Sequence, residues 1–314
     1  MFLQFKRPSE NLSDGLTNGE TVTVVSLCYG YDYTGNLIHR KLPDGEVQNY
    51  FYDLHDQLVK AEIFKKDGTK ETWAYTYDAL GRRIGKGRLK NEEVSDGLKE
   101  ETGFVWDGSH LLQEIHPDGR YTYIYTDPDS YEPLAQVRNW TNEDGESKQE
   151  IHYFHCDQIG IPREMTDKDG NLVWFGNYTG WGRLKEETKV TYNAYQPFRL
   201  QNQYADRETG LHYNFFRYYE PDAGRFINQD PIRLWGGDNF YWFAPNSSAW
   251  IDVLGLASIF EKLKITTSDG FLFKGFTVKA PFNIPVQRFG DLHLNSSRGD
   301  FWGLRIGTNK FIKN

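Results

Sequence analysis

A Tyr-Asp dipeptide recurs in the first part of the chain, and a turn-forming segment follows each copy. The copies begin at Tyr31, Tyr52 and Tyr77, which are 21 and 25 residues apart. Asp-Gly pairs occur at 44–45, 67–68, 96–97, 107–108, 118–119, 144–145 and 169–170. Asp-Gly favours the tight turn of a β-hairpin, because glycine takes a positive φ freely and aspartate tolerates one. This repeat predicts a ribbon of short antiparallel strands.

The segments between these turns alternate in the manner of strands. In 71–77 and 121–125, aromatic or apolar residues occupy every second position, which excludes an amphipathic helix there. Aromatic residues make up 16% of the chain, and aromatic pairs across strands contribute roughly 0.2–1 kcal/mol each. Such a sheet must protect its edges, by rolling up or by stacking.

Cysteine content and hydropathy exclude several classes of protein. With only Cys28 and Cys156, the chain can form one disulfide bridge at most, so cysteine usage does not settle the redox compartment. No apolar run is long enough to span a membrane, and the N-terminus lacks a signal-peptide core. Export is therefore expected to require another route, or an N-terminal region outside this sequence.

Charge divides the chain near residue 256. Residues 257–314 contain nine Lys or Arg against four Asp or Glu, a net charge of +5, which leaves −13 for residues 1–256. The division indicates two units with different partners, with compositional drift as the alternative.

Two longer segments carry a more specific pattern. The first, 152–167, reads HYFHCDQIGIPREMTD, and the second, 198–226, reads FRLQNQYADRETGLHYNFFRYYEPDAGRF. With the Tyr-Asp repeats, they resemble the YD repeats and repeat-associated core of the Rhs family of polymorphic toxins, over about residues 25–256. The resemblance implies a mainly β fold, in which a ribbon of hairpins forms part of a spiral shell that the core closes around a variable C-terminal toxin.

The resemblance also implies the domain organisation. Residues 1–24 form a lead-in, 25–149 the repeat region, 150–256 the core with a self-cleavage motif, and 257–314 a small β-rich toxin domain. Family position places the cut between Leu256 and Ala257, which agrees with the charge boundary.

Asp230 and Asp252, 22 residues apart, match the two aspartates that precede the family's cleavage point. Two carboxyls that share a proton can activate a water and polarise a carbonyl, because close like charges push their pKa values apart. The alternative places Asp230 in a turn and makes Asp252 a loop cap. Arg225 is a candidate to support one carboxylate, or to form a structural ion pair.

Two positions depart from the family motif around the cut. Val253 and Ser247 stand where the family usually has proline. Proline fixes φ and extends the residue before it, so Asp252 lacks one restraint here, and cleavage can be slow or absent.

The basic C-terminal unit has the minimum that an RNA- or DNA-cleaving toxin requires. His293 is its acid–base candidate, and the candidate phosphate-binding residues are Arg288, Arg298, Arg305 and Lys310. The alternatives are an ordinary surface histidine, or a truncated or inactive toxin.

Two further patterns favour structure over chemistry. His152, His155, Cys156 and Asp157 resemble a metal set, but positions 152 and 155 of a strand face opposite ways. The segment 236–239 lacks the following helix of a phosphate loop. No metal or cofactor is predicted.

The resulting hypothesis is an Rhs-type protein, or a fragment of one, that releases a basic effector by self-cleavage, with nuclease as the candidate activity of that effector. From the resemblance we expect a secreted or delivered protein for interbacterial competition, with an immunity protein and secretion machinery as partners. The alternatives are a non-enzymatic surface or carbohydrate-binding scaffold, and an inactive displaced remnant.

Overall fold

The computed structural model describes residues 27–90, 97–236, 238–245, 247 and 250–256, together with the strand backbones at 2–5 and between 259 and 306. Two compact units divide the chain. The first comprises Met1–Tyr75 and Lys86–Glu100, and the second comprises Thr76–Gly85 and Glu101–Asn314. The four domains expected from the sequence stay a prediction.

The first unit is an antiparallel sheet whose strands pair in chain order. Its strands are β1 (Phe2–Phe5), β2 (Leu27–Tyr31), β3 (Leu37–Lys41), β4 (Val47–Tyr52), β5 (Leu58–Phe64) and most of β6 (Lys70–Tyr77), with parts of β7 (Arg83–Leu89) and β8 (Leu98–Asp107). Ala61 and Ile63 of β5 are fully buried, and they share a face because they are two residues apart on a strand. Apolar burial on that face fixes the strand register.

The aspartate of each Tyr-Asp repeat closes its own hairpin turn. Oδ1 of Asp53 accepts the backbone N–H groups two and four residues further on, at 2.8 and 2.9 Å. Asp32 and Asp78 make the same pair of hydrogen bonds. Three residues after Asp32, Gly35 has φ 90°, and Asp56 takes the matching place with φ 59°. The repeat therefore encodes a side-chain-closed turn that needs a left-handed residue three positions after the aspartate.

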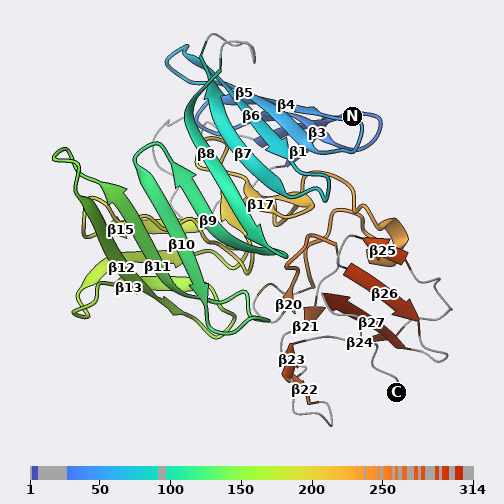
Figure 1. Cartoon of the computed structure of the whole chain (residues 1–314). Coiled ribbons are helices and arrows are strands. Elements are labelled where there is room, and N and C mark those ends of the chain that lie inside the picture. The colour runs from blue at the N-terminus through green and yellow to red at the C-terminus, as the bar shows by residue number, and fades with distance from the viewer. Residues whose placement is uncertain are drawn as a thin grey trace, which may run out of the picture. The chain divides into compact units, whose positions relative to one another are not determined.

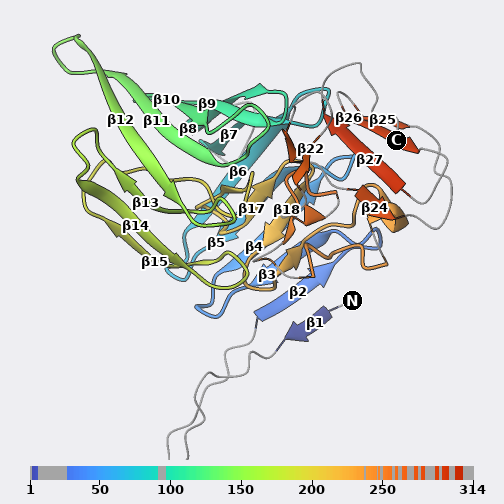
Figure 2. The same ribbon diagram turned by 90° about the horizontal axis from the view of Figure 1, so that it is seen from below.

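The second unit continues the same hairpin pattern (Figures 1 and 2). Each strand pairs antiparallel with the next. The strands are β9 (His110–His116), β10 (Gly119–Tyr125), β11 (Pro133–Thr141), β12 (Ser147–Cys156), β13 (Pro162–Thr166), β14 (Leu172–Tyr178) and β15 (Leu184–Lys189). A smaller antiparallel sheet follows, with β16 (Tyr204–Ala205), β17 (His212–Asn214), β18 (Arg217–Glu220) and β19 (Arg225–Phe226).

Aromatic packing stabilises the small sheet. Tyr219 and Phe226 of this sheet lie in an apolar cluster with Leu200 and Phe243. The rings of Tyr219 and Phe243 have centroids 5.0 Å apart. Aromatic pairs at such distances add to the free energy gained from burial alone.

A buried polar network connects the small sheet to the long hairpins. Glu114 of β9 is fully buried, and its carboxylate accepts hydrogen bonds from the hydroxyls of Tyr123, Tyr195 and Tyr204. A buried carboxylate with this many donors is compensated for the loss of water.

The remaining elements are short. They are the 3-10 helix η2 (Arg233–Gly236), β20 (Trp250–Ile251), β21 (Ile259–Phe260), β22 (Lys264–Thr266), β23 (Leu272–Lys274), β24 (Thr277–Lys279), β25 (Gln287–Phe289), β26 (Leu292–Ser296) and β27 (Phe301–Ile306). The last four form a sheet in the order β24-β27-β26-β25. The described residues contain no α-helix, and the predicted mainly β class is confirmed.

The described part of the chain has no helix that is long and apolar enough to cross a membrane. Cys28 and Cys156 are both free thiols. Burial raises the pKa of Cys156 well above that of an ordinary thiol, which makes its reactive thiolate scarce at neutral pH.

Candidate active site

Arg217 joins the two aspartates that the sequence singles out. Its Nη2 atom lies 3.2 Å from Oδ2 of Asp230 and 3.3 Å from Oδ2 of Asp252. The side chains of Arg217 and Asp252 are 1% exposed, and that of Asp230 is 5% exposed. Two carboxyl groups in a water-poor site of this kind require compensation of their charge, either by a cation or by a proton on one of them. The planar guanidinium meets this need because it donates several hydrogen bonds in fixed directions.

Backbone hydrogen bonds fix Asp230 at the start of a turn. Its N–H donates to the carbonyl of Phe240 at 2.9 Å, and its carbonyl accepts from the N–H of Arg233 at 2.9 Å. Its Oδ1 accepts from the N–H of Ile232 at 3.0 Å. The turn around Pro231 thus leaves the other carboxylate oxygen for Arg217.

Asp252 follows β20 directly and closes a loop that ends at the predicted cut. Its Oδ1 accepts the backbone N–H of Leu256 at 3.0 Å. Gly255 has φ 66°, and a Cβ there would lie 2.7 Å from the backbone oxygen of Asn214. Nε of Arg217 donates to the Gly255 carbonyl. The loop therefore needs glycine both for its left-handed backbone and for its close approach to β17.

Apolar packing seats this loop in the second unit. Val253, Leu254 and Leu256 are buried in a cluster with Phe215. Half-buried aromatic and aliphatic side chains surround the cluster, including that of Trp106. The loop before the predicted cut is therefore held like a core segment, although it has no regular secondary structure.

Burial and charge set the proton affinity of the site. Burial is the largest influence on Asp230 and raises the pKa of its carboxyl to about 7. The charge of Asp252 also raises this pKa, whereas Arg217 and the N–H of Ile232 lower it. Burial lowers the pKa of Arg217, against the effect of both carboxylates. A carboxyl with a pKa near 7 can donate a proton at neutral pH.

The arginine that contacts both aspartates is Arg217, whereas the sequence suggested Arg225 as a support for one carboxylate or as part of a structural ion pair. Arg225 lies on β19, and its guanidinium sits 4.4 Å from the ring centroid of Tyr241. The signal that could have found Arg217 is its place in the segment 212–219, HYNFFRYY, where it is the one Lys or Arg among aromatic residues. An arginine among so many aromatic residues is a candidate for burial, and a buried arginine requires an acidic or carbonyl partner.

The histidine and cysteine pattern of β12 is spread over both faces of the strand. His152 is buried, with Nε2 3.4 Å from Glu150, whereas His155 is exposed and bonds to the hydroxyl of Thr166. Among the described residues, no group of three or more His, Cys, Asp or Glu side chains is placed to hold a metal ion.

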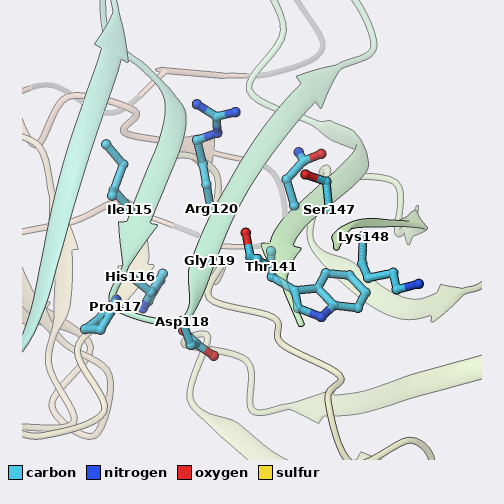
Figure 3. A pocket seen from close by; sticks show the side chains of 11 residues that line it. Ile115, His116, Pro117, Asp118, Gly119, Arg120, Thr141, Ser147 and Lys148 are labelled. Carbon is cyan, nitrogen blue, oxygen red and sulfur yellow. The ribbon is translucent and has the colours of Figure 1, made fainter. Parts of the chain in front are cut away.

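A separate surface pocket of about 600 Å³ lies at the ends of the hairpins β9–β10 and β11–β12 (Figure 3). Arg120, Trp140 and Ser147 are among the residues that line it. The guanidinium of Arg138 lies 4.6 Å from the centroid of the Trp140 ring. The lining therefore includes an aromatic residue together with residues that can form hydrogen bonds.

Comparison with known proteins gives the family. Residues 151–188 match the family described as RHS protein. The chain is 39% identical over 242 residues to double-stranded DNA deaminase toxin A of Burkholderia cenocepacia, and 34% identical over 242 residues to toxin protein Tse5 of Pseudomonas aeruginosa. The chain belongs to the Rhs family. A third relative of this Rhs chain, named probable deoxyribonuclease RhsA, comes from Dickeya dadantii and is 30% identical over 239 residues.

These alignments cover most of this Rhs chain and a small part of each relative. They span 74%, 70% and 73% of this chain, but 17%, 18% and 15% of the three relatives. The crystal structure of TcdB2-TccC3 shares the fold, with a TM-score of 0.50 and 19% identity over 74% of this chain and 14% of that one.

The candidate toxin residues of this Rhs chain lie partly on described strands. The backbone register of β25, β26 and β27 places His293 opposite Arg288 and Arg305. Arg298 and Lys310 lie outside the described residues, as does Ala257 at the predicted cut.

Proposed function

We propose that this Rhs chain cuts its own backbone between Leu256 and Ala257 and so releases the basic C-terminal segment. One arrangement carries the proposal: Arg217 bridges Asp230 and Asp252, and Asp252 also accepts the N–H of Leu256. One carboxylate of the pair therefore contacts the residue whose carbonyl would be cleaved.

In the proposed reaction, ionised Asp252 takes a proton from a water molecule as the water oxygen attacks the carbonyl carbon of Leu256. Protonated Asp230 donates its proton to the leaving nitrogen of Ala257. The C–N bond breaks, one water is consumed, and the products are a carboxyl group on Leu256 and an amino group on Ala257. Arg217 remains charged and holds both carboxylates in position.

Expression of the full chain tests this reaction directly. On a denaturing gel, the wild type is expected to yield a small C-terminal fragment that Asp252→Asn does not yield. Mass spectrometry of the fragment should show Ala257 at its N-terminus. One intact band for both proteins would contradict self-cleavage and favour the scaffold or remnant interpretation.

The released segment is proposed to be an effector that acts on nucleic acid in a competing cell. Its net charge of +5 suits phosphate binding. The name of the Dickeya dadantii relative, a probable deoxyribonuclease, is consistent with this class. Delivery would involve secretion machinery, and an immunity protein would protect the producing cell.

Expression in bacterial cytosol tests the effector. Growth arrest and DNA or RNA degradation by the full chain, absent when a stop codon follows Leu256, would support a nuclease. Normal growth with both forms would favour an inactive remnant.

A second candidate function, saccharide binding, rests on the surface pocket. Indole rings present an apolar face for contact with a sugar ring, and hydroxyl and guanidinium groups bind sugar hydroxyls. Glycan-array binding by the full chain that Trp140→Ala abolishes, but Trp181→Ala does not, would support it. Trp181 is an exposed tryptophan that does not line the pocket.

A further inference from the structure

Four successive carbonyl groups before the predicted cut each accept a hydrogen bond from outside their loop. The donors, in chain order of the carbonyls 252 to 255, are Asn214 Nδ2 at 2.8 Å, Asn202 Nδ2 at 2.5 Å, the N–H of Phe216 at 3.2 Å, and Nε of Arg217. A buried loop must satisfy its carbonyls. Here, three of the four donors are side chains, so side-chain hydrogen bonds hold most of the loop's backbone carbonyls in place.

The two asparagines are placed specifically for this contact. Asn214 is fully buried at the end of β17. Asn202 has φ 60°, a left-handed conformation that asparagine tolerates better than most residues, in the turn before β16. Each amide reaches the loop across a long stretch of sequence, of 38 residues for Asn214 and 51 for Asn202.

We propose that Asn202 and Asn214 are positioning residues that set which peptide bond is presented to the two carboxyls. This inference rests on the proposed self-cleavage. The asparagines hold the carbonyls of Asp252 and Val253, and Leu256, the last residue before the cut, lies four and three residues beyond them. A shift of the chain by one residue would break these hydrogen bonds.

The hydrogen bond from Asn202 restrains position 253, where this chain has valine in place of the family's usual proline. Val253 leaves the backbone φ free, whereas proline would fix it. The hydrogen bond from Asn202 to the Val253 carbonyl, with the burial of the Val253 side chain, restrains this position by other means.

The test measures the rate of cleavage and the mass of the fragment for the full-length chain. Asn202→Gly keeps the positive φ and removes only the side chain, and Asn202→Asp keeps the shape and removes the donor. Asn214→Ala removes the second donor. Asn177→Ala is the control, since Asn177 is exposed on β14 and donates to Glu186.

We expect the two Asn202 variants and Asn214→Ala to cut at least ten-fold more slowly and to give fragments with more than one N-terminus. For Asn202→Gly and Asn214→Ala the pH dependence of the rate should not change, because neither substitution adds or removes an ionisable group. Thermal unfolding identifies any variant that does not fold. The Asn202 variants decide the outcome if Asn214→Ala is unstable.

Two results would overturn the inference in distinguishable ways. Self-cleavage stands if the wild type cuts and Asp252→Asn does not. In that case, folded Asn202 variants that cut at the wild-type rate and give a single N-terminus at Ala257 would refute the positioning role and leave the proposed self-cleavage intact. If the wild type does not cut, or Asp252→Asn cuts equally well, the proposed self-cleavage fails and the positioning role fails with it.

Discussion

Oδ1 of Asp252 accepts the backbone N–H of Leu256 at 3.0 Å. This contact folds the chain back on itself, so that a carboxylate lies beside the residue whose carbonyl belongs to the predicted cut. The other carboxylate oxygen of Asp252 lies 3.3 Å from Arg217, which also contacts Asp230. The side chain of Arg217 therefore links the loop that contains Asp252 to Asp230.

Removing either carboxyl should stop cleavage. Asp230→Asn and Asp252→Asn are each expected to lower the cleavage rate by at least 100-fold, because general acid–base catalysis typically contributes a factor of about 10²–10⁴. Quantitative gels over time measure the rate. The control is Asp238→Asn, which alters an exposed aspartate, and equal rates for all three variants would contradict the assignment.

Cleavage should slow as the pH rises through about 7. The proposed acid is protonated Asp230, whose pKa burial raises to about 7, so its proton is lost above that pH. The rate measured from pH 5 to pH 9 is expected to fall about ten-fold per pH unit on the alkaline side, as the protonated fraction does. A rate that rises steadily to pH 9 would exclude Asp230 as the acid.

Asp230 should also make stability depend on pH. Between about pH 4 and pH 7 the folded chain holds a proton on Asp230 that the unfolded chain releases, so stability falls as the pH rises. Asparagine at this position cannot lose a proton, so the free energy of unfolding of Asp230→Asn should rise relative to that of the wild type by on the order of 2–4 kcal/mol from pH 4 to pH 8. Urea unfolding at both pH values measures it, and a constant difference would contradict the raised pKa.

Arg217 should influence the pKa of Asp230 as well as the geometry of the site. Arg217→Gln removes the charge that lowers the pKa of Asp230, so the alkaline limit of cleavage should move to higher pH while the rate falls at least ten-fold. Arg163→Gln is the control, because Arg163 pairs with Asp157 on a half-exposed surface. An unchanged rate and pH limit in folded Arg217→Gln would remove Arg217 from the site.

Gly255→Ala should distort the loop by two separate effects. Alanine at φ 66° costs roughly 1–2 kcal/mol, and its Cβ would lie 2.7 Å from the backbone oxygen of Asn214. Because both effects act together, the variant should lose more unfolding free energy than the backbone cost alone, and it should cut more slowly. Gly170→Ala separates the effects, since Gly170 has φ 83° with nothing within 4 Å. Equal losses of unfolding free energy for the two variants would show that the close approach has no role.

The hairpins could be predicted from the sequence, because the hydrogen bonds that close their turns form within five residues. The aspartate of each Tyr-Asp repeat bonds to N–H groups two and four positions away, as Asp53 does, and strand alternation is likewise local. Asp230 and Asp252 were candidates from the resemblance to the Rhs family, and their spacing of 22 residues says nothing about their distance in space.

Only the tertiary structure decided what surrounds those aspartates. Arg217 reaches Asp252 across 35 residues, and Asn202 reaches Val253 across 51. Such contacts depend on how β17 and β18 pack against the loop after β20, and no periodic pattern records that packing. Local hydrogen bonds follow from neighbouring residue types, whereas a buried charge finds its partner only where the whole unit has excluded water.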